Sequence, residues 1–212
     1  MNSYSKSIEF DEAKHQYKVM GKVVPSVTEI VAPLTYSKYR VDNAVVEQAA
    51  YRGSLIHELT ALWDRGDLEE DSPMAADVAL YLQAWINFCH DYSPKWEYIE
   101  LPIASGNYAG TIDRIGEIDG KKVVVDIKTT SSMDRANKIA LCTQILGYVF
   151  LCWENNLNVS FCNSIGVQLK KDGTYSVINA DDVETKYQFN SSELWDHLMF
   201  INKLTKGDRS IE

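Results

Sequence analysis

The sequence predicts an α+β fold in which a mixed β-sheet is flanked by helices. Residues 43–65 and 74–92 carry apolar side chains at helical spacing, whereas residues 98–129 switch to the period of strands. A helix is expected over 134–155, apolar almost all round from Ile139 to Trp153, followed by a hairpin and a last helix. Because strands and helices come in separate runs and do not alternate regularly along the chain, the predicted class is α+β.

The helices before the sheet are indicated by local signals. Residues 1–24 have the pattern of short extended pieces, with a turn at Gly21. Ser26 followed by Glu29 has the spacing of a capping box, which predicts a short helix after Pro25. In the helix over 43–65, three leucines form one stripe: Leu55, Leu59 and Leu62. Prolines bound the helix over 74–92 on both sides.

The strands are expected over 98–104, 108–118 and 121–129. Asp119-Gly120 is a strong signal for a two-residue hairpin turn between the last two. A second hairpin is expected from strands over 159–170 and 174–178. A single helix is expected to run from residue 181 onward.

The 212 residues suit a single domain, with 1–50 as an N-terminal extension and 51–155 as the core that carries the active site. No apolar run approaches the roughly 20 residues that span a bilayer, and the polar start lacks a secretory signal. We therefore expect no membrane and a cytoplasmic location. The four cysteines lack the C-x2-C spacing of a zinc or redox site and are expected to be buried free thiols.

The net charge of −9 argues against a protein that coats nucleic acid non-specifically. The excess of acidic residues is unevenly distributed along the chain, because residues 51–100 hold 3 basic and 10 acidic side chains. The acidic stretch over 64–77 is expected to point away from an anionic substrate. The nearly neutral quarters of the chain remain free to face such a partner.

The hairpin around Asp119-Gly120 carries the most informative residues. A two-residue turn pairs Ile118 with Lys121, and the same register then places Asp113 opposite Asp126 with Cβ atoms about 5 Å apart. Facing carboxylates repel each other, and a divalent cation such as Mg²⁺ or Mn²⁺ is the simplest compensation. Strand alternation puts Lys128 on the face of Asp126, while Val123, Val125 and Ile127 point to the opposite face.

Two carboxylates, a metal ion and an ammonium group form a set that can hydrolyse a phosphodiester. The metal polarises the phosphate and activates a water molecule, and the lysine orients that water or stabilises the developing negative charge. The alternative is an exposed hairpin face with an ordinary ion pair between Asp126 and Lys128.

The sequence Gly110-Thr111-Ile112-Asp113, followed by Asp126-Ile127-Lys128, resembles the PD-(D/E)XK nuclease superfamily. It is most similar to the RecB-like exonuclease branch, which includes phage-borne members. Three further elements of that branch occur in the same order: His57 on an upstream helix, Glu100 before the first aspartate, and Gln144 with Tyr148 downstream. The proline of the superfamily's name is absent, as it often is in this branch.

The resemblance implies a restriction-endonuclease-like core with the order αβββαβ. It also implies that His57, Asp113, Asp126 and the Ile127 carbonyl bind Mg²⁺ or Mn²⁺. Lys128 would be the catalytic lysine. Glu100 would be an auxiliary acid, and Glu97 is the alternative for that role. The implied activity is exonuclease action on DNA in phage or prophage recombination, repair or replication, with recombination proteins as possible partners. Related proteins with an iron–sulfur cluster carry a cysteine grouping that this chain lacks, so no cluster is expected.

Other residues have two readings. Gln144 and Tyr148 lie one helical turn apart and form either a core network or a substrate contact at the edge of the site. Arg135 and Lys138 are expected to mark the DNA-binding side. An aromatic and basic group, Tyr36, Lys38, Tyr39 and Arg40, either contacts DNA or is an ordinary loop. An endonuclease of the same chemistry, or a DNA-binding module without activity, are the alternative functions.

Overall fold

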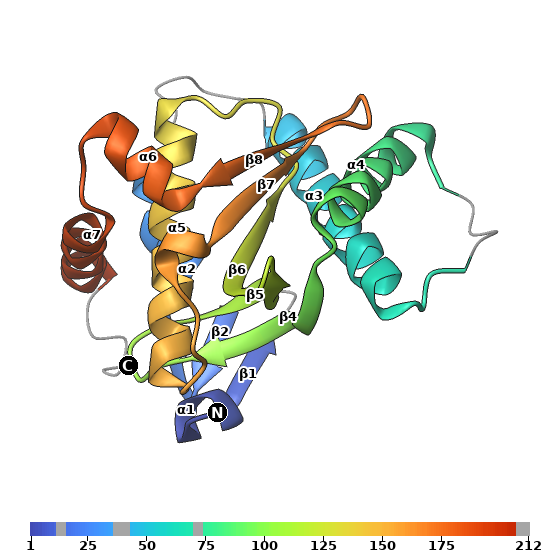
Figure 1. Cartoon of the computed structure of the whole chain (residues 1–212). Coiled ribbons are helices and arrows are strands. Elements are labelled where there is room, and N and C mark those ends of the chain that lie inside the picture. The colour runs from blue at the N-terminus through green and yellow to red at the C-terminus, as the bar shows by residue number, and fades with distance from the viewer. Residues whose placement is uncertain (12–15, 36–42, 70–73, 207–212) are drawn as a thin grey trace.

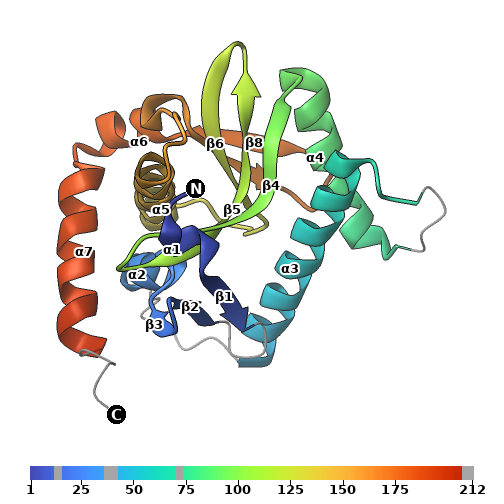
Figure 2. The ribbon, with the colours of Figure 1, turned by 90° about the horizontal axis from the view of Figure 1, so that it is seen from below.

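The computed structural model describes residues 1–11, 16–35, 43–69 and 74–206. A five-stranded sheet lies between two layers of helices (Figures 1 and 2). Helices α3 (Asn43–Arg65) and α4 (Ala76–Tyr92) lie on one side, and α5 (Arg135–Glu154) lies on the other. The predicted α+β class with a mixed sheet between helices is confirmed.

The sheet has the strand order β4-β5-β6-β7-β8. Its strands are β4 (Lys95–Ala104), β5 (Ala109–Ile118), β6 (Lys121–Lys128), β7 (Ile165–Leu169) and β8 (Tyr175–Asn179). Only the pairing of β6 with β7 is parallel, because α5 carries the chain from one to the other across a face of the sheet. The segment from α4 to β7 therefore has the predicted order αβββαβ.

The β5–β6 hairpin has the predicted register. Ile118 pairs with Lys121, and Arg114 pairs with Val125. Asp119 and Gly120 both have positive φ, as a two-residue type I′ turn requires. The paired residues end at Arg114, and this register continued by one residue places Asp113 opposite Asp126.

Helix α5 is the central helix of the core. Among the described residues, it alone is long and apolar enough to cross a membrane, but 67% of its most apolar stretch is buried inside the fold. Its apolar character thus reflects its packing between the sheet and α7 (Ser191–Lys206). Gly147 permits this packing, since an added Cβ would lie 2.5 Å from the Trp195 ring.

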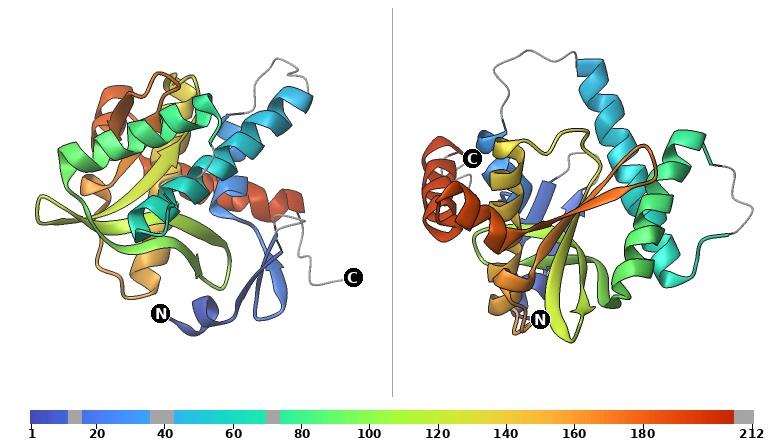
Figure 3. Two further views of the ribbon diagram at one scale, coloured as in Figure 1. Left: turned by 90° about the vertical axis from the view of Figure 1, so that its right-hand side faces the viewer. Right: turned by 45° about the horizontal axis from the view of Figure 1, so that its top comes forward.

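The N-terminal segment forms a small antiparallel sheet of β1 (Ile8–Asp11), β2 (Gln16–Val19) and β3 (Lys22–Val24), preceded by α1 (Ser3–Lys6). The predicted capping box is confirmed: Ser26 and Glu29 bond each other's backbone N–H groups at the start of α2 (Val27–Val31). Helix α2 packs in the same apolar cluster as α5, and the right-hand view of Figure 3 shows both on the same side of the main sheet. The predicted N-terminal extension is thus packed into the core.

Three details differ from the prediction. The strand expected over 159–170 begins only at Ile165, because residues 161–163 form a 3₁₀ turn, η2 (Phe161–Asn163); a second such turn, η1 (Ala32–Leu34), follows α2. The expected last helix is divided into α6 (Ala180–Tyr187) and α7 by Gln188, whose φ of 52° ends α6. Cys162 is exposed, whereas the other three cysteines are buried free thiols as predicted.

Candidate active site

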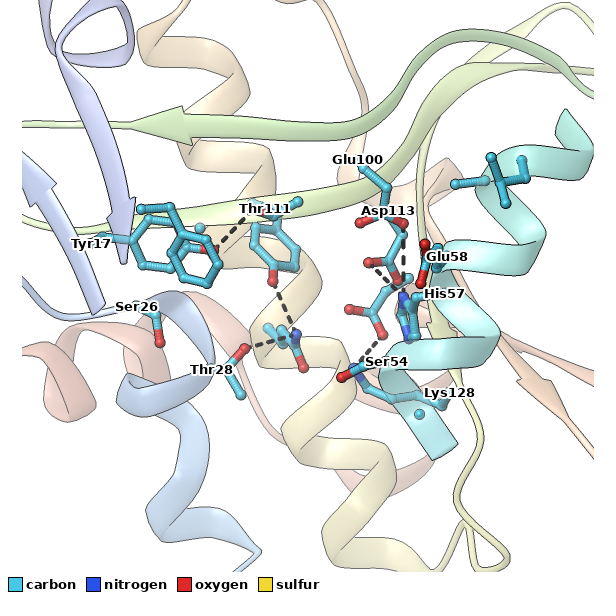
Figure 4. Close-up of a pocket in the computed structure, with 18 of the residues that line it drawn as sticks. Tyr17, Ser26, Thr28, Ser54, His57, Glu58, Glu100, Thr111, Asp113 and Lys128 are labelled. Carbon is cyan, nitrogen blue, oxygen red and sulfur yellow. Dashed lines mark hydrogen bonds and ion pairs between the residues drawn. The ribbon is translucent and has the colours of Figure 1, made fainter. Parts of the chain in front are cut away.

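A cleft of about 640 Å³ lies between α3, the strands β4 to β6, α5 and the N-terminal segment. Figure 4 shows His57, Asp113, Glu100 and Lys128 together on one side of it. These residues come from segments that are up to 71 positions apart, and the fold brings them to one place.

Asp113 is held by two kinds of partner. Its Oδ2 atom accepts a hydrogen bond from the Ile127 N–H at 2.6 Å, and its Oδ1 lies 3.3 Å from His57 Nδ1. Burial by itself would raise the pKa of Asp113, but His57, Lys128 and the Ile127 N–H outweigh it and lower the pKa. Asp113 therefore stays a carboxylate.

Asp126 is a buried carboxylate with incomplete compensation. It is 2% exposed, and its Oδ2 lies 2.6 Å from Lys128 Nζ as an ion pair, without a well-directed hydrogen bond. Burial raises its pKa to about 6, a shift that Lys128 opposes and Asp113 increases. A buried carboxylate oxygen whose one charged partner is a lysine, beside a second carboxylate, is a suitable ligand for a hard cation.

His57 and Glu100 complete this group. One ligand atom each from His57, Glu100 and Asp113 lies within 4.8 Å of the other two. Burial by itself would lower the pKa of His57, but the carboxylates of Asp113 and Glu100 prevail and raise it to about 10. Without a metal ion, the protonated histidine is thus a cation beside these two acids.

Between the two candidate auxiliary acids, the structure brings only Glu100 into the cleft. Glu97 forms an ion pair with Lys122 instead. Glu100 has a φ of 52°, a left-handed conformation that costs a non-glycine residue about 1–3 kcal/mol. Such strain in a strand is typical of residues whose position is fixed by a function.

Arg114 is a site residue that the sequence analysis missed. Its side chain is fully buried and donates to Asp64 at 2.5 Å, to Glu100 at 3.0 Å and to the Thr60 hydroxyl at 3.1 Å. Its guanidinium also stacks on the Trp85 ring. The only sequence signal for this role is a charged residue inside an otherwise apolar strand. Asp64 therefore belongs to the core and not to a solvated acidic stretch.

Gln144 and Tyr148 are buried and also line the cleft, so the core network is confirmed and the substrate contact stays a prediction. The Gln144 amide donates to the Tyr148 hydroxyl at 3.2 Å and to Thr28 Oγ1 at 3.5 Å. Gly110 explains how Tyr148 fits, because an added Cβ would lie 2.8 Å from its ring. The glycine of the Gly110-x-x-Asp113 motif is thus a packing requirement.

The predicted DNA contacts on α5 do not line the cleft. The Arg135 guanidinium lies over the Tyr187 ring, 5.3 Å from its centroid, and Lys138 is half-buried. The Ile127 side chain is buried in the apolar cluster beneath α4, so only its backbone faces the acids. The group of Tyr36, Lys38, Tyr39 and Arg40 lies outside the described residues.

The N-terminal segment supplies one wall of the cleft, which sequence reasoning did not foresee. Phe10, Tyr17, Ser26 and Thr28 all line it. The Tyr17 hydroxyl is 2.9 Å from Thr111 Oγ1 and so joins the small sheet to β5. The hydrophobic alternation of residues 16–19 predicts a strand but gives no signal of its partner.

No family model matches the sequence, and no curated protein matches it. Among solved structures, the chain is similar to one described as "Crystal structure of SSO0001", with 13% sequence identity. The match covers 74% of this chain and 86% of that chain, with a TM-score of 0.35. A similarity at this level supports no inference about function.

Proposed function

We propose that the protein is a metal-dependent DNA nuclease of the RecB-like branch of the PD-(D/E)XK superfamily. The observation that carries the proposal is the convergence of the predicted residues in one cleft: His57, Glu100, Asp113, Asp126 and Lys128. An ordinary surface ion pair between Asp126 and Lys128 would not require a buried aspartate facing a second one. The αβββαβ order also supports this assignment.

The donor set fits a hard divalent cation. Among the described residues that line the cleft, four are acids, Glu58, Glu100, Asp113 and Asp126, but only Lys128 and Arg65 are permanently basic. His57, Asp113, Asp126 and the Ile127 carbonyl would hold Mg²⁺ or Mn²⁺, which would polarise the scissile phosphate and acidify a bound water.

The chain's own residues have separate roles in this reaction. The Lys128 ammonium, next to Asp126, is placed to stabilise negative charge on the phosphate or to orient the attacking water. Glu100 acts as the auxiliary acid and is held by Arg114. Gln144 and Tyr148 hold the other side of the substrate.

The resemblance favours an exonuclease acting in phage or prophage DNA recombination, repair or replication in the cytoplasm. An endonuclease of the same chemistry is the alternative, and a DNA-binding module without activity is the second. The intact set of Asp113, Asp126 and Lys128 argues against the module.

The test is cleavage of labelled linear and closed circular DNA with Mg²⁺, with Mn²⁺ and with a chelator. We expect metal-dependent degradation of linear DNA that Asp126→Asn and Lys128→Ala abolish. The exposed Asp196 on α7 provides a matched control, because Asp196→Asn should cleave like the wild type. Cleavage of closed circles would identify an endonuclease, and DNA binding without cleavage by the wild type would identify the module.

Metal binding is tested separately by thermal unfolding. A ligand that binds only the folded state raises the melting temperature by mass action. Mn²⁺ should therefore stabilise the wild type, and His57→Ala should reduce that shift. Equal shifts in both proteins would remove His57 from the ligand set.

A further inference from the structure

The cleft has two chemically different halves. The ionisable groups come from α3 and from β4 to β6, and they form the half that contains His57, Asp113 and Lys128. The opposite half is formed by Phe10, Tyr17, Ser26, Thr28 and Thr111, none of which is charged. Figure 4 shows Tyr17, Ser26, Thr28 and Thr111 across the cleft from His57 and Lys128.

Phe10 gives the neutral half an aromatic surface. It lies opposite Tyr17 in the β1–β2 pair, with ring centroids 4.6 Å apart, and Tyr17 supports it from a buried position. The Phe10 side chain nevertheless remains 39% exposed. A large apolar ring that is both supported from behind and exposed in a polar cleft is suited to stacking.

Neutral hydrogen-bonding groups lie between the two halves. The Gln144 amide nitrogen is used by Thr28 and Tyr148, which fixes the direction of the amide. The Gln144 Oε1 atom accepts no hydrogen bond from the described part of the chain. Burial and the nearby carboxylates of Asp126 and Asp113 raise the pKa of Tyr148 well above its ordinary value, so its hydroxyl stays neutral.

We propose that the neutral half of the cleft, with Phe10 as its stacking surface and Thr28, Gln144 and Tyr148 along its border, binds the base of an unpaired nucleotide next to the scissile phosphate. This proposal rests on the proposed nuclease function and extends it to the form of the substrate. Aromatic stacking with neutral polar groups is the chemistry that recognises unpaired bases. A phosphate would instead need cations, and none of the described residues that form this half is charged.

The cleft also suits a single strand by its form. Its volume lies within the 300–1,000 Å³ that is usual for small-molecule sites. A base inside a duplex has both faces covered by its neighbours, so it would have to leave the stack to contact Phe10. The protein should therefore favour unpaired strands or frayed ends.

The test measures binding without cleavage. In an Asp126→Asn background with Mg²⁺, fluorescence anisotropy would give the affinity for a labelled single-stranded 12-mer and for a blunt duplex of the same sequence. Phe10→Leu keeps an apolar side chain in β1 but removes the ring, and it should weaken single-strand binding about 5- to 100-fold. Phe10→Trp should restore it.

Two controls make the result specific. Phe200 on α7 is also exposed but lies outside this cleft, and Phe200→Ala should bind like the parent protein. A 12-mer in which every base is absent should bind weakly, and Phe10→Leu should weaken its binding no further. Equal single-strand affinity in parent and Phe10→Leu, or an equal loss for the duplex, would overturn the proposal.

The two hypotheses fail in different ways. If wild-type protein does not cleave DNA but Phe10→Leu still weakens single-strand binding, the nucleobase site stands and the nuclease does not. If the wild type cleaves and Phe10→Leu binds like its parent, the nuclease stands and the nucleobase site does not.

Discussion

The buried ion pair between Arg114 and Asp64 gives the sharpest stability prediction. The Arg114 side chain is fully buried, and the Asp64 side chain is 1% exposed. Arg114→Met keeps much of the apolar volume but leaves the Asp64 carboxylate without its cation. Removing one partner of a buried pair costs about 3–5 kcal/mol, because the other charge stays buried and uncompensated.

Urea unfolding followed by tryptophan fluorescence measures this cost, and the double variant Asp64→Asn with Arg114→Met is its control. An asparagine at position 64 is neutral and keeps an acceptor for the Trp85 N–H, which lies 3.1 Å from Asp64 Oδ1. The double variant should therefore recover most of the lost stability. A single variant that loses less than about 1 kcal/mol, or a double variant no more stable than the single one, would refute this reasoning.

The same variant should show a characteristic pH dependence. Burial already raises the pKa of Asp64 above its ordinary value, and Arg114 opposes this rise. In Arg114→Met the folded-state pKa should rise further above that of the unfolded chain. Protonation then favours the folded state, so the difference from wild type should shrink as the pH falls from 8 towards 5.

Three shorter predictions concern the cleft of the metal-free protein. Asp126→Asn should raise the melting temperature at pH 8 in the presence of a chelator, because ionised Asp126, with its pKa raised to about 6, costs stability above that pH; an unchanged or lower value would contradict the facing-charge argument. Gly110→Ala should lose about 1–3 kcal/mol in urea unfolding, since its Cβ would overlap the Tyr148 ring, and the same substitution should cost less when it is made in a Tyr148→Ala background. His57 has a pKa of about 10 in the folded state, against its ordinary value of 6.5 in the unfolded chain. Its contribution to the free energy of unfolding is therefore complete below pH 6.5 and is lost as the pH rises towards 10. If the free energy of unfolding of His57→Gln falls with pH in the same way, another group causes the dependence.

The hairpin could be predicted in detail because its signals are local. A two-residue turn fixes the pairing of every residue beyond it, so Asp119-Gly120 alone determines which residues face Asp113. The capping box at Ser26 and the helices over 43–65 and 134–155 are equally local. The break at Gln188 was missed because no glycine or proline marks it.

The rest of the site depends on contacts between distant segments. Arg114 and Asp64 are 50 residues apart, and nothing in the acidic stretch distinguishes Asp64 from its solvated neighbours. The wall formed by Phe10 and Tyr17 depends on how the small sheet docks on β5, which no periodicity encodes. Propensity and spacing predict elements, whereas these contacts depend on packing.

Strand alternation separates two kinds of acid in the cleft. Asp113 and Arg114 are neighbours in β5 and point to opposite sides, so the guanidinium reaches Glu100 and Asp64 but does not neutralise the carboxylate of Asp113. The charge of Glu100 is shared with Arg114, whereas Lys128 is the only permanent cation that the described residues place beside the facing pair of Asp113 and Asp126. The charge available to a divalent cation therefore comes mainly from the facing pair.

This separation predicts different effects of two conservative substitutions. Asp113→Asn should abolish most of the rise in melting temperature that Mn²⁺ produces, because it removes one of the two facing charges. Glu100→Gln should reduce the rise less, since Arg114 already offsets much of that charge. Each variant is compared with its own metal-free protein by thermal unfolding, which removes differences in intrinsic stability. A larger loss of the Mn²⁺ shift in Glu100→Gln than in Asp113→Asn would mean that Glu100, and not the facing pair, supplies the principal charge for the metal.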